Sequence, residues 1–551
     1  MLRRKPHFAL LLLTLSSFFL QGAASLSAPN SWAPVVTPMS AGRSNACSVL
    51  LRDGSTLFTG GTGQAGPLSS AELFGADNRF HSVPPMMNAR SGHACALLPD
   101  GTVLVAGGRT SGGGITNAVE VFDPESMTWS SGQPMGEARA AATVSVLRDG
   151  RILIAGGDVS SGPSDSLEIY NAETGGFRHV EAALSSPRRE HAATVLADGR
   201  VLLLGGSDGS KVLDTADLFD PATEHVTAAG KLKIARAGLT ATTLLNGRVL
   251  IAGGSDGKNE IGAAEVFNPK SLQFQLDPSI MIAPRRDHTA VRIPGNNTVV
   301  IAGGTFQGRP LSQTEIYIPW RHRFQGAGDL ASAKTAMTAG ALRHAGKLLI
   351  AGGRNSSGIQ STAEIISVPT IATDKGDYHP GEPVTFSGSG WLPNKPVRIV
   401  MTEDSEIDQP GTIVTMADAD GNISDSSFAP DLLDIGVKFY VTATQEGPLD
   451  ANGQPTSLTA QTTFTDAANF KFTDGTGGDC ANGANQYQSL GAAAAFGQKV
   501  CATATGLGSG SSNVTVIGYS RTPPSCLPRA SPLAPATFRI FRRRTQPVSG
   551  R

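Results

Sequence analysis

The sequence predicts an all-β protein, a seven-bladed β-propeller closed by an N-terminal strand and followed by a β-sandwich. Three observations predict this fold class. Pairs of adjacent glycines recur seven times at a nearly constant period, each period repeats one order of short strands and turns, and a run of alternating strands follows the last period. The 551 residues include 65 glycines and 34 prolines, which is typical of a turn-rich fold.

Composition also excludes several classes of protein. Only 17% of the residues are charged and the net charge is −1. This balance argues against a coiled coil, a disordered acidic chain or a protein with a basic face for nucleic acid. We therefore expect no nucleic-acid partner.

The glycine pairs organise residues 30–369. They are spaced by 47 to 50 residues, a period typical of propeller blades. The seven pairs are Gly60-Gly61, Gly107-Gly108, Gly156-Gly157, Gly205-Gly206, Gly253-Gly254, Gly303-Gly304 and Gly352-Gly353.

Each period predicts one four-stranded blade, as residues 188–226 illustrate. A strand of small residues spans 191–196, a tight hairpin follows at Asp198-Gly199, and an apolar strand over 201–204 ends at the glycine pair. A third strand covers 217–219. We expect the first strand to line the central channel, because neighbouring blades crowd there and leave room only for small side chains.

An acid precedes the third strand in every period, and a bulky apolar residue of the fourth strand follows eight or nine residues later in the first six. Glu364, the last acid, has no such residue after it, whereas Trp32 has the features of a fourth strand with nothing before it. The N-terminal strand should therefore complete the last blade and close the ring, which leaves no unpaired inner edge. The acids are Glu72, Glu120, Glu168, Asp217, Glu265, Glu315 and Glu364.

The glycine pair, the acid before strand three and the aromatic residue on strand four resemble the kelch repeat over residues 30–369. The chain departs from that pattern in lacking a tyrosine before the glycine pair. The resemblance implies a seven-bladed kelch-type β-propeller and, by itself, no activity.

Residues 370–466 predict a small antiparallel β-sandwich. Strands are expected after Asp377 and at 397–401, 412–416, 439–443 and 459–465. This segment resembles the immunoglobulin-like modules of exported bacterial proteins. Residues 467–520 are expected to begin a further partial β module, and residues 521–551 form either an Arg/Pro-rich disordered tail or out-of-frame sequence.

The start of the chain predicts export. Basic residues, an apolar run from Phe8 to Leu20 and small residues up to Ala24 form a secretory signal peptide over 1–24. The run is too short for a membrane-spanning helix, so an uncleaved anchor is the weaker interpretation. We expect the mature chain to be secreted and to have no transmembrane segment. We also expect it to be monomeric. Five cysteines are too few for a disulfide scaffold, although Cys480 and Cys501 could pair.

Two repeated residue types are candidates for binding. Arginines that open the first strands predict a ring at one channel mouth, which would either bind an anionic ligand or pair with the repeat's own acids and carbonyls. The second interpretation is favoured, since a ligand site usually needs asymmetric residues. The arginines are Arg43, Arg90, Arg139, Arg188, Arg236 and Arg285. For His93, His191 and His288, spacing by whole blades likewise favours a structural role over a metal site.

Galactose oxidase resembles the chain in having a seven-bladed ring followed by an immunoglobulin-like domain. That resemblance would imply a copper site of two tyrosines, one of them cross-linked to cysteine, and two histidines. The ring offers only Tyr170 and Tyr317, at third-strand positions filled elsewhere by phenylalanine. We therefore expect no copper and no other cofactor. The segment Asp418–Asn422 is interpreted as a hairpin turn between two strands, since it lacks the later glutamate of a calcium loop.

These observations favour an exported, non-catalytic binding or scaffold protein that presents propeller loops to an extracellular protein or glycan. The loops that vary most between periods are 62–70, 109–117 and 305–313, and variable loops on a rigid ring are where recognition concentrates. One alternative is an enzyme, either a galactose-oxidase-like copper enzyme or another carbohydrate-active protein. A third class, a purely structural protein that packs in a surface layer, has the same sequence features as the first.

Overall fold

The computed structural model describes residues 29–342, 346–379, 381–404, 411–431, 437–449 and 455–466, together with the backbone of five short strands beyond them. The predicted signal peptide, Cys480 and Cys526 lie outside the described residues. The described part is almost entirely β-structure, and its one helical element is a 3-10 turn, η1, at Pro319–Arg321.

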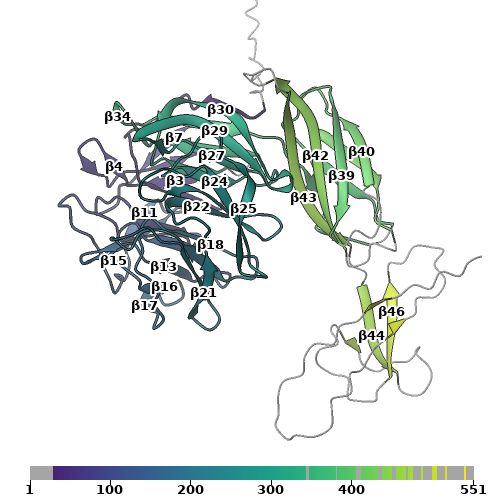
Figure 1. Cartoon of the computed structure of the whole chain (residues 1–551), viewed down its shortest axis with the longest axis horizontal. Helices are drawn as coiled ribbons and strands as arrows, with labels where there is room; N and C mark the ends of the chain where they lie inside the picture. Colours follow the sequence, from purple (N-terminus) through teal and green to yellow (C-terminus); the bar gives the residue numbers. More distant parts are fainter. Residues whose placement is uncertain are drawn as a thin grey trace, which may run out of the picture.

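Seven antiparallel sheets of at least four strands each form the propeller (Figure 1). In each blade the strands are ordered from the inside outward. Blade 1 contains β2 (Cys47–Leu50), β3 (Thr56–Thr59), β6 (Ala71–Phe74) and β7 (Phe80–Val83); blade 2 contains β8 (Ala94–Leu97), β9 (Val103–Ala106), β10 (Val119–Asp123) and β11 (Thr128–Ser131). Blade 3 contains β12 (Thr143–Val146), β13 (Ile152–Ala155), β16 (Leu167–Asn171) and β17 (Gly176–His179); blade 4 contains β18 (Ala192–Val195), β19 (Val201–Leu204), β20 (Thr215–Asp220) and β21 (His225–Lys231).

The remaining three blades repeat this order. Blade 5 contains β22 (Ala237–Thr243), β23 (Val249–Ser255), β24 (Ala263–Asn268) and β25 (Gln273–Ile280); blade 6 contains β26 (Thr289–Arg292), β27 (Val299–Ala302), β29 (Arg309–Ile318) and β30 (Arg323–Lys334), with β28 (Thr305–Phe306) paired to β29. Blade 7 contains β31 (Thr338–Ala341), β32 (Lys347–Ala351), β35 (Ala363–Ser367) and β1 (Ser31–Pro34).

The first strand of the chain closes the ring, as the sequence predicts. Strand β1 pairs antiparallel with β35, so that Trp32 lies opposite Ile366 and Pro34 opposite Glu364. The inner strands contact one another in blade order, and β31 of blade 7 contacts β2 of blade 1. The outermost strand of blade 7 is β1, the first strand of the chain. Backbone hydrogen bonds between β1 and β35 therefore hold the beginning and the end of the propeller sequence together.

The hydrophobic core lies between the blades. The second strand of each blade is an apolar run that is fully buried, and its side chains pack against the neighbouring sheet. The aromatic residue on strand four packs on an aromatic residue of strand three in most blades, for example Phe122 against Trp129 with ring centroids 4.9 Å apart. The acid-to-aromatic spacing of the repeat therefore encodes a cross-strand pair, which stabilises the outer edge of a blade.

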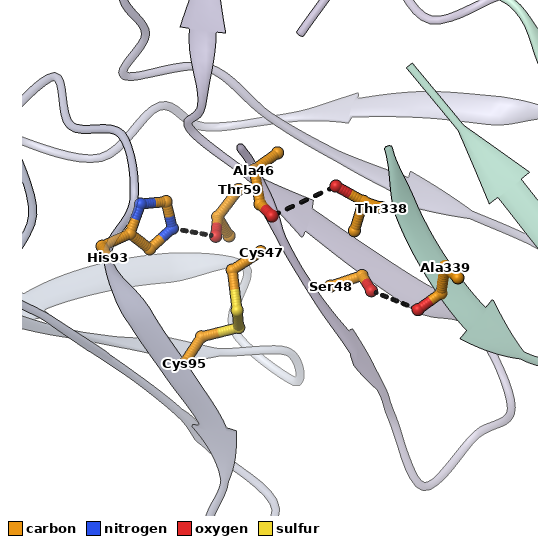
Figure 2. Close-up of a disulfide and its surroundings, with 8 residues drawn as sticks. All are labelled: Ala46, Cys47, Ser48, Thr59, His93, Cys95, Thr338 and Ala339. Atoms are coloured by element: carbon orange, nitrogen blue, oxygen red, sulfur yellow. Dashed lines mark hydrogen bonds between the residues drawn. A yellow bond between two sulfur atoms is a disulfide. The ribbon is translucent and has the colours of Figure 1, made fainter. Parts of the chain in front are cut away.

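Strand β2 is joined to both of its neighbours (Figure 2). Cys47 on β2 and Cys95 on β8 form a disulfide with a Cα–Cα distance of 6.1 Å. On the other side, Ser48 donates a hydrogen bond to the carbonyl of Ala339 in blade 7. The sequence analysis did not predict this pairing; the pair that it considered, Cys480 with Cys501, involves a residue outside the described part of the chain.

The β-sandwich that follows has two sheets. One contains β36 (Ala372–Thr373), β38 (Val384–Gly388) and β41 (Ile423–Phe428), and the other contains β37 (Asp377–Tyr378), β43 (Pro455–Asp466), β42 (Lys438–Leu449), β39 (Pro396–Glu403) and β40 (Gly411–Met416). Trp391 and the inward residues of both sheets form one core. The predicted strands are present, β36, β37 and β41 are additional, and an immunoglobulin-like topology stays a prediction.

The segment Asp418–Asn422 forms a turn, as predicted, but the prediction of a hairpin is wrong, because the strands on either side of it are not paired with each other. The backbone N–H of Asp418 donates to the carbonyl of Asn422, and an Asp418 carboxylate oxygen accepts from the N–H groups of Asp420 and Asn422. The turn connects β40 to β41, which belong to different sheets. Its carboxylate is therefore used to order the turn.

Beyond residue 466 the structure describes five short strands by their backbone. They form two small sheets, β44 (Asn469–Gly475) with β45 (Gln486–Tyr487) and β46 (Lys499–Thr505), and β47 (Val516–Ile517) with β48 (Arg539–Ile540).

The propeller has two different ends. Hairpins between strands one and two lie at one end of the blades, and the loops that follow the glycine pairs lie at the other. These loops form the small hairpins β4 (Thr62–Gly63) with β5 (Gly66–Pro67), β14 (Asp158–Val159) with β15 (Gly162–Pro163), and β33 (Arg354–Asn355) with β34 (Gly358–Ile359). In Figure 1, β4, β15 and β34 are at the left and the sandwich is at the right, on the opposite side of the propeller. We call the end with these hairpins the loop face.

Candidate functional site

The arginines of the predicted ring are buried beneath the loop face, and each forms an ion pair with the acid of its own blade. Nitrogen-to-oxygen distances are 2.6 to 2.9 Å, and Lys334 with Glu364 takes the same place in blade 7 at 2.8 Å. The six arginine pairs are Arg43–Glu72, Arg90–Glu120, Arg139–Glu168, Arg188–Asp217, Arg236–Glu265 and Arg285–Glu315.

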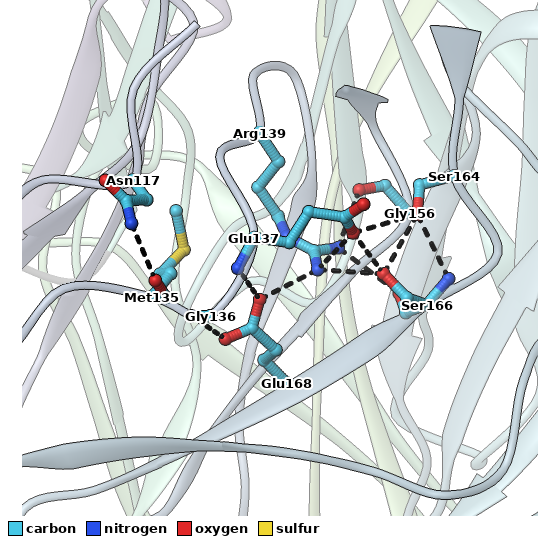
Figure 3. A network of polar contacts seen from close by, with 9 residues as sticks. All are labelled: Asn117, Met135, Gly136, Glu137, Arg139, Gly156, Ser164, Ser166 and Glu168. Carbon is cyan, nitrogen blue, oxygen red and sulfur yellow. Dashed lines mark hydrogen bonds and ion pairs between the residues drawn. The ribbon is translucent and has the colours of Figure 1, made fainter. Parts of the chain in front are cut away.

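Each pair belongs to a larger polar network (Figure 3). Arg139 donates to the carbonyl of Gly156 and to the carboxylate of Glu168, and Glu168 also accepts from the backbone N–H groups of Gly136 and Glu137. The acid therefore fixes both the arginine and the connection that enters the blade. Because the Glu168 carboxylate bonds both to the guanidinium and to the backbone, the network orders the blade.

Burial governs the electrostatics of the arginines. Arg236 is fully buried, and this desolvation lowers the pKa of its guanidinium, while the charge and hydrogen bond of Glu265 act in the opposite direction. The interpretation that the arginines pair with the repeat's own acids thus describes the geometry in all six blades. Their role as an anion-binding ring stays a prediction, and it would require a ligand to displace a buried carboxylate.

The glycine pairs connect one blade to the next. The second glycine of each pair donates its N–H to the carbonyl of the arginine or lysine that opens the following blade, at 2.8 to 3.0 Å, and Gly353 donates to Arg43 across the closure. The first glycine lies where a side chain would collide: at Gly205, with φ +65°, a Cβ would be 2.6 Å from the Arg236 carbonyl oxygen. Only glycine combines this close approach with the left-handed backbone.

The three histidines have the structural role that was favoured. His93, His191 and His288 each pair through Nε2 with a threonine hydroxyl of the preceding blade at 2.9 Å. Burial, followed by the charge of nearby arginines, lowers the pKa of each ring to about 3. The three are therefore neutral at physiological pH. Within the described residues, no three His, Cys, Asp or Glu side chains are grouped to hold a metal ion.

We call the buried ion pairs and the glycine pairs of the seven blades the frame. Above this frame, seven residues with a left-handed backbone surround the axis where the inner strands begin. Their φ values lie between 49° and 66°. Backbone hydrogen bonds of 2.7 to 3.5 Å link six of the seven neighbouring pairs, and the pair without a direct bond is Ala141 with Glu190. The residues are Asn45, Gly92, Ala141, Glu190, Gly238, Asp287 and Ala336. We call this arrangement the mouth ring.

The mouth ring is asymmetric because its side chains differ from blade to blade. Glu190 and Asp287 project from it as exposed acids, whereas the blade between them contributes Gly238. A Cβ at Gly238 would lie 2.7 Å from a carboxylate oxygen of Asp287, so the glycine makes room for this side chain. Although the Asp287 side chain is partly exposed, neighbouring residues desolvate its carboxyl and raise its pKa; the charges of Glu190 and Glu260 act in the same direction, and Arg286 opposes them.

Charged residues also stand around the mouth ring. Arg109 forms an ion pair of 2.7 Å with Asp158 of the next blade, and Arg189 approaches the same aspartate at 3.6 Å. On the other side, Arg286 lies 3.7 Å from Glu260. These partly exposed pairs connect neighbouring blades, and they give the loop face a mixed pattern of charge.

The structure places the predicted loops 62–70, 109–117 and 305–313 on this loop face, around the mouth ring. Sequence reasoning identified these loops and missed Arg189, Glu190, Arg286 and Asp287, which occupy the two positions after the frame arginines. The available signal was that these two positions carry charge only in blades 4 and 6. In the other blades they hold small or uncharged polar residues.

Comparisons with known proteins agree with this architecture. A family model for the KLHDC2/KLHL20/DRC7 Kelch-repeats domain matches residues 46–254. The fold is similar to that of a fungal alcohol oxidase of the AA5 family, solved in complex with copper, with a TM-score of 0.52 and 15% sequence identity over 79% of this chain and 99% of that chain. No curated protein matches the chain. The propeller is of the kelch-repeat type, and at this identity the structural similarity defines the fold alone.

The copper of that oxidase raises the question of whether this chain offers ligands for it. Tyr170 packs against Phe177 in blade 3, and Tyr317 is buried in blade 6, where its phenol donates to Asp277 at 2.6 Å. His322 also contacts this carboxylate, through Nδ1 at 2.8 Å. Burial and the Asp277 hydrogen bond raise the pKa of Tyr317 far above its ordinary value. One tyrosine with one histidine does not match the set of two tyrosines, a cysteine and two histidines, so the described residues do not fit such a site.

Proposed function

We propose that the protein is an exported, non-catalytic binding or scaffold protein that recognises an extracellular protein or glycan with its loop face. A kelch-repeat domain is typical of propellers that mediate protein interactions. The predicted signal peptide supports export, and none of the described helical structure is long and apolar enough to cross a membrane. Cleavage after Ala24, read from the N-terminus of the exported chain, tests this localisation.

One observation carries the proposal: the frame is repeated and the loop face is not. Every blade has the buried cation, the acid and the glycine pair, whereas the first position after the pair changes in charge and size from blade to blade. These residues are Thr62, Arg109, Asp158, Ser207, Ser255, Thr305 and Arg354. A rigid ring with different side chains at equivalent positions is suited to recognition, since the ring fixes where each side chain lies.

The position of the sandwich supports the same face. It packs against the opposite end of the blades, through residues such as Asn296, and leaves the loop face uncovered by the described chain. A large partner can therefore approach the mouth ring without displacing another domain.

A loop exchange tests the proposal. In the blade 6 loop, Phe306, Gln307 and Arg309 are replaced by Ser, Gly and Ser, which keeps Thr305 and its hydrogen bond with Thr335. Binding to a glycan array and to a display library of extracellular protein domains is then compared with that of the unaltered chain. We expect binding to be lost while the melting temperature is unchanged. Glu173→Ala, in an exposed turn at the other end of the blades, is the control and should bind normally. Binding that survives exchange of the post-glycine loops in all seven blades would refute the proposal.

Similarity to an oxidase fold favours one second candidate, a copper-dependent or other carbohydrate-active enzyme. Metal analysis of the purified chain after incubation with copper, together with mass spectrometry for a tyrosine–cysteine cross-link, discriminates between the two. Stoichiometric copper with such a cross-link would favour the enzyme. Copper removed by gel filtration and an unmodified Tyr317 peptide would favour the binding protein.

A further inference from the structure

The contact between the propeller and the sandwich is specific. The hairpin between β26 and β27 in blade 6 carries Asn296 and Asn297 in place of the Asp-Gly or Asn-Gly turn of other blades. The Asn296 side-chain amide donates to the carbonyls of Pro369 and Thr459, both at 2.7 Å. Asn297 donates to the carbonyl of Gln461 at 2.6 Å. Both asparagines are buried, so the hairpin is fixed to strand β43.

A second contact lies beside the first. Arg321 of η1 donates to the Ser457 hydroxyl at 3.0 Å, and Gln325 on β30 exchanges hydrogen bonds with the Ser457 backbone. The two contacts hold the domains in a fixed relation around a pocket. Its walls are therefore in place before any ligand arrives, which reduces the entropy that binding would cost.

The pocket between the domains has a volume of about 310 Å³. This lies at the small end of the range of small-molecule sites. The propeller provides the hairpin of blade 5 and the turn η1, and the sandwich provides residues of β39, β42 and β43. The walls are formed by Leu245, Asn246, Asn297, Pro319, Trp320, Thr402, Tyr440 and Gln461.

The wall is aromatic and polar and contains no charged side chain. Trp320 from the propeller and Tyr440 from the sandwich are its aromatic members, and Asn246, Thr402 and Gln461 supply amide and hydroxyl groups. Burial, followed by the charge of Asp404, raises the pKa of the Tyr440 phenol, which therefore stays neutral. The Lys438 ammonium lies 5.3 Å from the centre of the Tyr440 ring, while the residues that line the pocket include no charged side chain. The lining therefore favours a neutral ligand.

Trp320 differs from the three other tryptophans in how its indole is used. The indole N–H groups of Trp32, Trp129 and Trp391 donate to a threonine hydroxyl, the Pro84 carbonyl and the Thr370 carbonyl, respectively. The Nε1 of Trp320 is buried and finds no acceptor among the residues that the structure describes. Within the described part of the chain, the Trp320 indole is therefore not fixed by a hydrogen bond, unlike the other three.

We propose that the pocket between the propeller and the sandwich binds a neutral sugar of one or two rings. The apolar face of a pyranose, with its axial C–H bonds, packs on an indole or phenol ring, and its hydroxyl groups combine donor and acceptor in one ligand. Its hydroxyl groups bind the amides of Asn246 and Gln461, which line the pocket. The pocket is at the opposite end of the blades from the loop face, so this site does not depend on the proposed function.

Titration of the full chain with neutral sugars tests the inference. The probes are glucose, galactose, N-acetylglucosamine, cellobiose, lactose and chitobiose, followed by saturation-transfer NMR and by tryptophan fluorescence. We expect saturable, millimolar binding of at least one probe. Trp320→Phe should weaken it by roughly tenfold, since it reduces the stacking surface. Trp129→Phe, on the outer strand of blade 2, is the matched control and should bind as the wild type does.

A blocking variant keeps the test decisive if Trp320→Phe alters folding. Thr402 is an exposed residue of β39 at the edge of the pocket, so Thr402→Trp fills the entrance without changing the core. Loss of binding in this variant, with an unchanged melting temperature, supports the site. The inference is overturned if no probe saturates, or if binding persists in both Thr402→Trp and Trp320→Phe. Loop exchanges on the opposite face leave sugar binding at this pocket unchanged, so failure of one proposal is distinguishable from failure of the other.

Discussion

Removing the charge of one frame acid should destabilise the propeller strongly. Glu265 and Arg236 are both fully buried and lie 2.7 Å apart. Glu265 also accepts the backbone N–H groups of Lys233 at 2.7 Å and Ile234 at 3.1 Å. In Glu265→Gln the amide has one acceptor oxygen, so its NH₂ group must face one of these donors. The guanidinium then remains buried with no opposite charge.

The expected loss in the free energy of unfolding is about 3–5 kcal/mol, the usual cost of breaking a buried ion pair from one side. Urea denaturation followed by circular dichroism measures it. Asp214→Asn removes an exposed pair, Lys231–Asp214 at 3.1 Å, and should cost less than about 1 kcal/mol. The double variant Arg236→Met/Glu265→Gln should lose less than the sum of its single variants, because no charge stays buried. A Glu265→Gln loss as small as that of Asp214→Asn would refute the view that these pairs hold the frame.

Three further predictions concern the same frame. The disulfide between Cys47 and Cys95 encloses a sequence separation of 48 residues. Cys47→Ser/Cys95→Ser should therefore lower the free energy of unfolding, measured by urea denaturation, by about 4 kcal/mol. Reductant added to the double variant shows the effect of reductant alone, and a loss no larger than this background would contradict the prediction. Burial lowers the pKa of His191 to about 3 in the folded protein, so between about pH 6.5 and pH 3 the unfolded chain binds more protons than the folded one. The contribution of His191 to stability is therefore complete above about pH 6.5 and decreases towards pH 3 by about 1.4 kcal/mol per pH unit. His191→Leu, which copies the residue type of blade 5, should flatten the pH dependence of the melting temperature in this window, and an unchanged slope would argue against a buried neutral ring. Gly253→Ala should lower the melting temperature sharply, because φ at this residue is +61° and the new Cβ would lie 2.5 Å from a backbone carbonyl oxygen. Gly112 has open space around it, so Gly112→Ala should have no effect in the same thermal assay.

The propeller was predictable from sequence because its geometry demands the same residues seven times. A Cβ at Gly205 would collide with the Arg236 carbonyl, and Arg236 in turn needs Glu265 as its partner. Each requirement fixes a residue type at a constant distance along the chain. The strand at Trp32 has the features of a fourth strand, and the last period is the one that lacks a fourth strand of its own. These two facts together predicted how the ring closes.

The repeat did not predict the disulfide between Cys47 and Cys95. Cys47 lies opposite Thr59, directly before a glycine pair, whereas Cys95 lies opposite Val105, one position further from the pair of its own blade. The two cysteines therefore do not occupy equivalent places in the repeat. Only the angle between adjacent blades brings their Cα atoms within 6.1 Å.

Contacts between domains lay beyond the sequence for a different reason. The departure from Asp-Gly at Asn296 and Asn297 was visible, but the acceptors are backbone carbonyls of β43, which any residue type supplies. The pocket beside them combines Trp320 with Tyr440, 120 positions away along the chain. No periodicity links these two residues, so only the docked domains reveal the site.

Closure of the ring by strand β1 fixes the loop face, and an engineered disulfide tests it most directly. Ala33 on β1 lies opposite Ile365 on β35. The Cα spacing of such a pair suits a disulfide. We expect Ala33→Cys/Ile365→Cys to oxidise in the folded protein, with the linked peptide found by mass spectrometry, whereas Ala33→Cys/Arg178→Cys, which places its partner in blade 3, does not. Free thiols at both positions in the folded protein would contradict a seven-bladed ring closed by its first strand.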